Sequence, residues 1–364
     1  MKKRILHVVE SFSTGILQSV AQICNHLQDD FDFAVLHGRR EETPDRVESH
    51  FLGTTNLILW NVQRAINPVG DARALRELDR AVQKLRPDLL HAHSSKAGAL
   101  CRLLALQRDL SVIYSPRGYS FLQRNHAAPI RGIYRTLEWG LGRLPHVTVA
   151  CGIGELLQAN AVSKRAIIIP NMIDLADIDR VKSPRTERDG RLIVAMSDSI
   201  RPQKNFPLFA RIAQDMADEP FDFLWIGGGK VDVQLPPNLT LTSWVGRNEA
   251  LATLSKAHVF AQTSLWEGLP IALLEAMAFE QPVLAMPGVG NSELVLDDLT
   301  GYLCQTPSDF VGRLREMFQN ADMRRRLGAA GRAFVERNHS VEANAARWAS
   351  LYASFSRYEK FGLS

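Results

Sequence analysis

Two glutamates, Glu267 and Glu275, have seven residues between them, in a segment that changes from a loop into a helix. Pro270 suits the first turn of a helix, where no backbone N–H is needed, and strong helix formers follow it. The amide groups of Gly268 and Leu269 at this helix start would attract a diphosphate. Glu275 on the helix could accept both hydroxyls of a ribose, and Glu267 in the loop could accept a sugar hydroxyl. The spacing favours a sugar-nucleotide site; the alternative is two solvated glutamates beside an ordinary amphipathic helix.

Other short motifs accompany this segment along the chain. With Ser264 before it, the segment resembles the signature of glycosyltransferase family 4, whose members are retaining enzymes of the GT-B fold. The other matching stretches are residues 5–10 leading to Gly15, 88–93, 169–174, 203–205, 226–229 and 281–283. The resemblance covers most of the chain. It implies a nucleotide-diphosphate sugar as donor, metal-independent transfer and an active site in a central cleft between two domains.

Short apolar stretches alternate with helical patterns, which is typical of parallel α/β sheets. The strand candidates are residues 5–9, 33–36, 89–92, 112–115, 147–150, 166–169, 192–196, 223–226, 239–241, 259–261 and 283–285. Helical spacing marks residues 18–27 and 72–85, and the chain looks helical from Phe310 onward. We therefore expect an α/β protein with two doubly wound, Rossmann-like domains, in which loops beyond the strand ends hold the ligand.

A polar, charged connector at residues 182–190 separates the two alternating parts. We expect an N-terminal acceptor-side domain over residues 1–180 and a C-terminal nucleotide-sugar-binding domain over residues 181–340. The resemblance implies that a last helix, within residues 341–364, crosses back to the first domain.

The composition agrees with a two-domain globular protein. The chain has 364 residues, of which 46% are hydrophobic and 23% are charged. Its four cysteines are scattered and form no Cys-x-x-Cys pair, which favours a reduced, cytoplasmic protein. The apolar stretch that follows the basic N-terminus stops at Glu10, and no run of about 18 apolar residues occurs. We expect a cytoplasmic protein that could work at the inner face of the cytoplasmic membrane.

A lysine and an arginine are candidates to offset the charge that grows on the diphosphate as the sugar leaves. Lys204 stands in a matching motif, although it could also be a solvated surface lysine. Many relatives carry an arginine five residues before this lysine, but Ser199 holds that position here. Arg201 could supply the missing charge, or the site could bind diphosphate less strongly. The resemblance makes Glu267, Lys204 and Arg201 the catalytic candidates. The donor-binding candidates are Gly15, Lys204, Arg201, Gly268, Leu269, Pro270 and Glu275.

Two positions of the N-terminal part, Gly15 and Arg117, bear on ligand binding. Arg117 departs from the family pattern, as Ser199 does, and Glu280 in the C-terminal part is a third departure from it. Gly15 is expected in the loop after the first strand, where it would let donor phosphate and acceptor approach, or would simply form a turn. Arg117 stands where many relatives carry histidine. It could bind an acceptor phosphate or a donor carboxylate, or only hold its loop in place. Glu280, where a small residue is common, is expected to affect only the end of its helix.

His91, His93 and Lys96 lie at the end of a strand candidate. A metal site would need a third ligand that is not evident, so we expect these residues to pack, to form hydrogen bonds or to lie on the acceptor side. The acceptor-side candidates are thus Arg117, His93 and Lys96. No Asp-x-Asp motif occupies a credible site, and residues 226–229 lack the Gly-x-Gly-x-x-Gly pattern of dinucleotide binding. We expect neither a metal nor another cofactor.

Residues 101–145 carry seven arginines but only two acidic residues, with aromatic residues interleaved. Such a surface attracts phosphate-bearing ligands. The net charge of only +4 argues against nucleic acid, which we do not expect as a partner. One helical face in this segment is apolar and consists of Ile130, Ile133, Tyr134, Leu137 and Leu141. This face could lie against an anionic membrane or against the protein core.

These features together predict a retaining, metal-independent glycosyltransferase of hexosyl type. It would move a sugar from a nucleotide-diphosphate sugar to a glycan or lipid-linked acceptor, in the synthesis of a surface polysaccharide such as lipopolysaccharide. A GT-B epimerase or phosphorylase would share the same cleft and is one alternative. A non-catalytic sugar-nucleotide-binding subunit is the other, and the departures at Ser199 and Arg117 motivate it.

Overall fold

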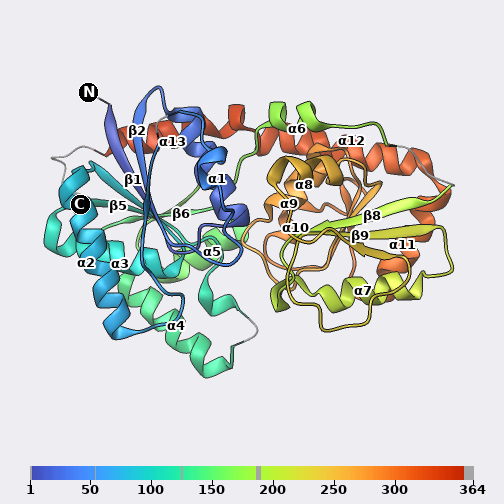
Figure 1. Cartoon of the computed structure of the whole chain (residues 1–364), viewed down its shortest axis with the longest axis horizontal. Coiled ribbons are helices and arrows are strands. Elements are labelled where there is room, and N and C mark those ends of the chain that lie inside the picture. The colour runs from blue at the N-terminus through green and yellow to red at the C-terminus, as the bar shows by residue number, and fades with distance from the viewer. Residues whose placement is uncertain (1, 54, 124–125, 186–189, 356–364) are drawn as a thin grey trace. The chain divides into compact units, whose positions relative to one another are not determined.

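The computed structural model describes residues 2–53, 55–123, 126–185 and 190–355. The chain divides into two compact units (Figure 1). The first unit contains Met1–Met172 and the C-terminal segment that begins at Asn344, and the second contains Ile173–Ala343. Each unit is built around one parallel β-sheet that is covered by helices.

The first sheet has seven strands in the order β3-β2-β1-β4-β5-β6-β7. The strands are β1 (Lys3–Val9), β2 (Phe31–His37), β3 (Asn56–Leu59), β4 (Leu89–His93), β5 (Ser111–Ser115), β6 (Val147–Ala150) and β7 (Ala166–Ile168). The helices are α1 (Thr14–Leu27), η1 (Val47–His50), α2 (Pro68–Leu85), α3 (Ser95–Arg108), η2 (Ser120–Leu122), α4 (Ala128–Leu141), α5 (Ile153–Val162) and α13 (Val341–Ser354). Alternate strand residues such as Leu6 and Leu90 form one core cluster with Leu78 of α2, as the two-residue period of a strand requires.

The second sheet has six strands in the order β10-β9-β8-β11-β12-β13. The strands are β8 (Leu192–Ser197), β9 (Phe221–Ile226), β10 (Leu239–Leu241), β11 (Val259–Gln262), β12 (Val283–Ala285) and β13 (Gly301–Leu303). The helices are α6 (Leu175–Val181), η3 (Pro202–Lys204), α7 (Phe206–Asp215), α8 (Arg247–Leu254), α9 (Ile271–Ala278), α10 (Asn291–Leu294), α11 (Pro307–Gln319) and α12 (Ala321–Asn338). Phe206 and Phe209 of α7 pack edge-on against Trp225 of β9 in its core.

Both sheets reverse their strand order once, and this reversal locates the expected ligand sites. In the first unit β1 pairs with both β2 and β4, and in the second unit β8 pairs with both β9 and β11. The connections therefore leave in opposite directions from β1 and β4, and likewise from β8 and β11. Ligands bind beyond the carboxyl ends of strands at such a switch point. Residues that follow these four strands are the first candidates for function.

The expected strands are all present, and two strands were not expected from the sequence. These are β3 and β13, which are four and three residues long. β3 is an edge strand without a fully buried residue, so its sequence carries little hydrophobic signal. The two units divide after Met172, ahead of α6, whereas the sequence led us to expect a boundary after residue 180. The reason is that α6 packs against α8 and α9, and its Asp179 pairs with Arg332 of α12 at 2.7 Å.

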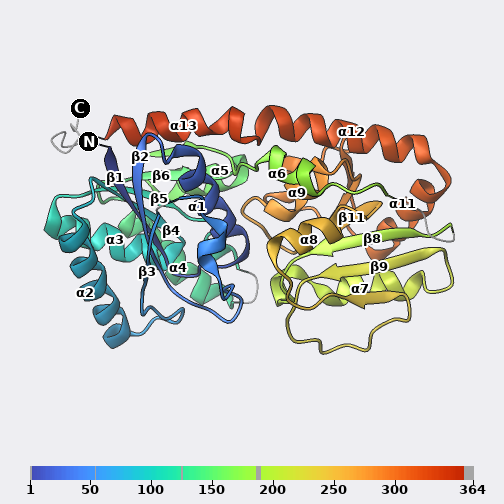
Figure 2. The same ribbon diagram turned by 45° about the horizontal axis from the view of Figure 1, so that its top comes forward.

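Helix α13 packs on the first sheet through aromatic side chains. Figure 2 shows it lying over the first unit, next to β1 and β2. The ring of Tyr352 lies 5.5 Å from that of Phe31, and Trp348 lies 5.0 Å from the ring of His91, measured between centroids. The ammonium group of Lys3 donates to the carbonyl of Ala353 at 2.6 Å. Within the described residues, no helix combines the length and the apolar character that crossing a membrane requires.

Candidate active site

The switch point of the second sheet holds a buried cluster of one cation and two carboxylates. Asp198 directly follows β8, Lys204 ends η3, and Glu267 lies in the loop after β11. The Lys204 Nζ atom lies 2.5 Å from Asp198 Oδ2 and 2.6 Å from Glu267 Oε1. All three side chains are at least four-fifths buried. The structure thus brings together Lys204 and Glu267, as expected, and adds Asp198, which the sequence analysis did not identify.

Amide side chains fix the orientation of the Glu267 carboxylate. Gln203 Nε2 donates to Glu267 Oε2 at 3.3 Å and to the carbonyl of Trp266 at 2.8 Å. Gln262 Nε2, at the end of β11, donates to Glu267 Oε1 at 3.3 Å. Each carboxylate oxygen therefore has at least one donor from the protein, and each keeps lone pairs that a substrate hydroxyl can use. Glu267 is held in place before any ligand arrives.

The charge state of Lys204 follows from its surroundings. Burial alone would lower the pKa of Lys204, but the carboxylates of Asp198 and Glu267 outweigh it, and the pKa lies above its usual value. Lys204 is therefore a fixed cation at neutral pH. Arg201 is half-exposed, and its Nη2 atom lies 3.6 Å from Asp198 Oδ1. Ser199, where the resemblance leads us to expect an arginine, donates its hydroxyl to the same oxygen at 3.1 Å.

Glycines bring the loop after β9 into contact with the loop that carries Asp198. Gly227 has a φ of +138°, and a Cβ atom built on it would stand 2.2 Å from the carbonyl oxygen of Asp198. Gly229 has a φ of +144° and would place a Cβ atom 2.7 Å from the carbonyl of Ile200. Any side chain at either position would push the two loops apart. Gly227 and Gly229 therefore allow the two loops to pack closely.

Glu275 lies on α9 and makes an ion pair of its own. Its Oε1 atom accepts a hydrogen bond from Arg247 Nη1, at the start of α8, at 2.6 Å, and both side chains are at least four-fifths buried. Pro270 immediately precedes α9, so Gly268 and Leu269 lie in the approach to its N-terminus. A Cβ atom on Gly290 would stand 2.7 Å from the carbonyl of Gly268, so a second loop closes on this approach. The sequence analysis did not identify Arg247.

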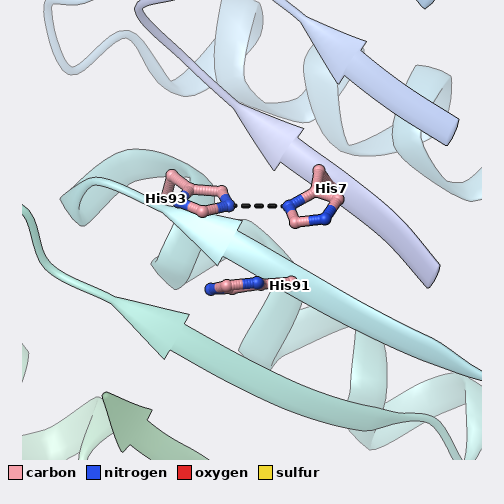
Figure 3. Close-up of side chains that lie close together, drawn as sticks. All are labelled: His7, His91 and His93. Atoms are coloured by element: carbon pink, nitrogen blue, oxygen red, sulfur yellow. Dashed lines mark hydrogen bonds between the residues drawn. The ribbon is translucent and has the colours of Figure 1, made fainter. Parts of the chain in front are cut away.

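The switch point of the first sheet holds three buried histidines (Figure 3). His7 is on β1, and His91 and His93 are on β4. His7 Nδ1 and His93 Nε2 are 2.9 Å apart and share a hydrogen bond. His91 uses both of its ring nitrogens, with the hydroxyls of Tyr352 at 2.8 Å and Ser115 at 3.0 Å. The expectation that no third ligand stands near His91 and His93 was wrong, because pairing of β1 with β4 brings His7 beside them.

These histidines nevertheless fit a neutral hydrogen-bonded cluster better than a cation site. Burial, and then the charge of Arg117, lower the pKa of His7 to about 3. Burial also holds the pKa values of His91 and His93 well below the usual range. A metal ion would have to displace the hydrogen bonds of His91 and stand near the positive charge of Arg117 without a carboxylate ligand. The structure therefore supports packing and hydrogen bonding as the role of His93.

Arg117 lies in a strained loop after β5. Its φ is +57°, a region that non-glycine residues rarely adopt. Its Nη1 atom donates to Asn171 Oδ1. The next amide, that of Gly118, donates to Glu155 Oε1 at 2.6 Å, and the amide of Cys151 donates to Glu155 Oε2 at 2.8 Å. The buried carboxylate of Glu155 on α5 thus holds the Arg117 loop in its unusual conformation.

The two remaining candidates lie in the same unit. Lys96 is on the first turn of α3 and pairs with Asp71 at 2.7 Å, so its charge is already matched. Gly15 is the second residue of α1, rather than part of the preceding loop. The helix begins earlier than the expected residue 18. Gly15, Arg117, His93 and Lys96 therefore belong to the first unit, and Glu267, Lys204, Arg201 and Glu275 belong to the second.

Sequence comparisons divide the chain in the same two parts. Residues 14–171 match the model of the "Glycosyl transferase 4-like domain", and residues 177–334 match that of "Glycosyl transferases group 1". A relative from Escherichia coli, named UDP-Gal:alpha-D-GlcNAc-diphosphoundecaprenol alpha-1,3-galactosyltransferase, is 25% identical over 269 residues. The match covers 66% of this chain and 68% of that protein.

Structural comparisons agree on the fold. Sucrose-phosphate synthase from Thermosynechococcus elongatus superimposes with a TM-score of 0.77 at 17% identity, over 97% of this chain and 98% of that chain. The Anabaena protein HepE, in complex with UDP and glucose, superimposes with a TM-score of 0.76 at 15% identity, over 96% of this chain and 99% of that chain. At these identities the comparison establishes the fold alone.

Two parallel sheets of this order, with the matches to both halves, define a glycosyltransferase of the GT-B fold. The chain belongs to glycosyltransferase family 4. In the cluster of Asp198, Lys204 and Glu267, Lys204 can offset negative charge on a departing phosphate, and Glu267 can accept a hydrogen bond from a sugar hydroxyl.

Proposed function

We propose that this glycosyltransferase moves a hexosyl group, with retention of configuration, from a nucleotide-diphosphate sugar to a glycan or lipid-linked acceptor of a surface polysaccharide. The observation that carries the proposal is the buried Lys204 between Asp198 and Glu267 at the switch point of the second sheet. The E. coli relative, whose name gives a UDP-sugar donor and a diphosphoundecaprenol-linked acceptor, supports the substrate classes.

The reaction breaks the bond between the sugar and the diphosphate oxygen. Lys204 and the half-exposed Arg201 provide positive charge for the oxygen that becomes negative. The acceptor hydroxyl attacks from the face that the diphosphate leaves, and its proton passes to a diphosphate oxygen, so no separate protein base is needed. Glu267 orients the transferred sugar, and Glu275 accepts the ribose hydroxyls. Because Lys204 and Arg201 stabilise the negative charge of the leaving group, the transfer proceeds without a metal or another cofactor.

Donor binding needs a rearrangement of the ion pairs. The described cluster contains two carboxylates, those of Asp198 and Glu267, against the two cations Lys204 and Arg201, so its formal charge sums to zero. A diphosphate adds negative charge that this sum does not match. The amides at the start of α9 and the dipole of that helix supply the remaining positive potential. Glu275 likewise has to share Arg247 with the ribose or release it.

The proposal is tested with a panel of nucleotide sugars. A thermal-shift screen identifies the donor, because a ligand that binds only the folded protein raises its melting temperature. The selected donor is then incubated with and without lipid-linked and glycan acceptors, and the products are separated. Transfer that requires acceptor supports the proposal. Conversion of the donor alone would indicate an epimerase, phosphate-dependent cleavage would indicate a phosphorylase, and binding without turnover would indicate a non-catalytic subunit.

We further propose that the protein works at the inner face of the cytoplasmic membrane and contacts it through α4. Ile130, Ile133 and Leu137 are 42%, 58% and 49% exposed, so this part of the apolar face does not pack in the core. Arg135 and Arg143 are exposed on or just after the same helix. The only acidic residue of α4, Glu138, is buried and pairs with Arg102. An exposed surface that is both apolar and cationic suits anionic lipid headgroups.

Liposome sedimentation tests the membrane contact. We expect binding to phosphatidylglycerol vesicles at low salt, weaker binding at high salt, and none to neutral vesicles. Ile133→Ser with Leu137→Ser should reduce binding strongly. The matched control is Ile66→Ser, because Ile66 is 63% exposed in the same unit but lies outside α4. If the double variant binds as the native protein does, α4 is not the contact.

A further inference from the structure

Arg117 presents a pair of parallel N–H groups that have no acceptor. Its Nη1 atom is bound to Asn171, whereas its Nε and Nη2 atoms are buried and without a partner. Nε and Nη2 form the side edge of the guanidinium group, where the two N–H bonds point in the same direction. This edge is the one that holds a carboxylate or a phosphate through two hydrogen bonds at once.

The surroundings of this edge lack a carboxylate that could complete it. Arg117 makes no ion pair within the described ranges, and Glu155, whose charge acts on it, gives both oxygens to backbone amides. The charge of Arg117 helps to lower the pKa values of His7, His91 and His93, and these three rings are buried and neutral. A buried cation without a partner destabilises a fold, so the position calls for an anion.

The chain holds Arg117 in this position at a cost. Its left-handed backbone conformation, with a φ of +57°, is unfavourable for a residue with a side chain. Glu155 accepts hydrogen bonds from the amide of Gly118 in this loop and from the amide of Cys151 directly after β6, and so connects the two segments. Asn171 holds the far end of the guanidinium group. These contacts fix the loop and one end of the guanidinium group, and they leave the Nε and Nη2 edge without an acceptor.

We propose that the Nε and Nη2 edge of Arg117 is an oxyanion subsite that binds a carboxylate or phosphate group of a substrate. The inference rests on the proposed function and deepens it, since it makes this enzyme selective for an anionic sugar. The anion can belong to the donor, as the carboxylate of a hexuronic acid, or to the acceptor, as a sugar phosphate. Both present two oxygens at the spacing of the arginine edge.

Calorimetry with two pairs of probes separates these sources. The donor pair is UDP-glucose and UDP-glucuronic acid, which differ only in a hydroxymethyl group against a carboxylate. The acceptor pair is glucose and glucose 6-phosphate, titrated into protein saturated with UDP. UDP, GDP, ADP and dTDP alone serve as references for the nucleotide site of the second unit. The variants are Arg117→Gln, which removes the charge, and Arg117→Lys, which keeps the charge but removes the bidentate edge.

We expect the native protein to prefer the anionic member of at least one pair by about tenfold or more. Both variants should lose this preference while they bind the nucleoside diphosphate as the native protein does. Arg131→Gln is the matched control, because Arg131 also has a buried Nε atom without a partner but lies on α4. It should keep the preference. Arg117→Lys keeps the test valid if the glutamine variant fails to fold.

The outcomes also distinguish a failure of the oxyanion subsite from a failure of the proposed function. If the native protein binds a nucleoside diphosphate but shows no preference in either pair, the oxyanion subsite is refuted and the proposed function stands. A preference that survives in both variants refutes the subsite as well. If none of the four nucleoside diphosphates binds, the proposed function fails, and the inference that rests on it fails too.

Discussion

The two units use the same topological position for opposite electrostatic arrangements. In the second sheet, the residues that follow β8 and β11 form a compact set of ion pairs around Lys204. In the first sheet, the residues on β1 and β4 are neutral histidines, and the nearby cation, Arg117, has no ion pair within the described ranges. Strand order fixes where a site forms, whereas the side chains at the strand ends decide its charge.

The difference indicates how each unit can meet a ligand. Around Lys204 the protein supplies its own counter-ions, so a diphosphate has to compete with Asp198 and Glu267 for the same ammonium group. No carboxylate competes in this way for the Nε and Nη2 atoms of Arg117 within the described residues, so an anion that binds them does not have to displace an ion pair. The first arrangement is stable without ligand and positions a cation for the bond-breaking step. The second arrangement, at Arg117, is stabilised by a bound anion and so favours substrates that carry one.

The largest expected effect comes from removal of the central cation. Lys204→Met should lower the transfer rate by about 10³-fold, because loss of one preorganised charge at the leaving group costs about 3 to 4 kcal/mol. The measurement is initial-rate kinetics with the donor found in the screen. Lys230→Met is the control, since Lys230 is 86% exposed in the same unit and pairs only with Asp232. A Lys204 variant that keeps more than a tenth of native activity would exclude Lys204 from the bond-breaking step.

The neutral histidine cluster predicts that the first unit loses stability in mild acid. The pKa of His7 falls from 6.5 to about 3 on folding, so between these pH values the unfolded chain binds a proton that the folded chain does not. Stability is fully present above pH 6.5 and is lost as the pH falls through this window. Within this window His7 alone costs up to about 1.4 kcal/mol per pH unit, and His91 and His93 shift in the same direction.

Hydrogen exchange of the β1 and β4 amides at pH values between 7 and 5 measures this loss directly. His7→Phe should make the dependence on pH shallower by about one proton, as it removes one of the three groups. The strands β8 and β11 of the second unit serve as an internal reference. An equal response of both sheets, or a flat response of β1 and β4, would show that the histidines do not carry the acid sensitivity.

The fold was largely predictable because alternation and chain order are local properties of the sequence. The strands that were missed, β3 and β13, are short, and β3 is an edge strand with no fully buried residue. Their existence depends on a neighbouring strand more than on their own hydrophobic pattern. The division between the units lies ahead of α6, and the packing of α6 on α8 and α9 leaves no mark in the sequence of the connector.

The site was only half predictable, for a related reason. Lys204 and Glu267 stand in motifs with fixed spacing, and the structure brings them within 2.6 Å of each other. Asp198 and Arg247 have no such spacing, and each reads as an ordinary polar residue until its partner is known. His7 and His93 are 86 residues apart in the sequence, so only the pairing of β1 with β4 reveals their contact.

The ion pair of Glu275 gives an intermediate effect. Glu275→Ala should weaken donor binding by about tenfold to a hundredfold, because hydrogen bonds to a charged group contribute about 1.5 to 3 kcal/mol. The transfer rate at saturating donor should change much less, which separates this residue from Lys204. Calorimetry with the donor measures the affinity. Glu249→Ala, an exposed glutamate on α8, is the control. Unchanged affinity in the Glu275 variant would contradict the ribose assignment.

The smallest expected effect concerns the cation that could replace the missing arginine at Ser199. Arg201→Gln should weaken nucleoside diphosphate binding several-fold at low salt, and the difference should shrink as salt rises, since Arg201 is 33% exposed and its charge is screened. Arg191 is a matched control, because its side chain is 34% exposed but it directly precedes β8, at the end of the strand opposite to the site. If Arg191→Gln and Arg201→Gln behave alike, only the general charge of the unit matters. A salt-dependent loss confined to Arg201 would indicate that the second unit, like the first, keeps one cation free enough to meet its ligand.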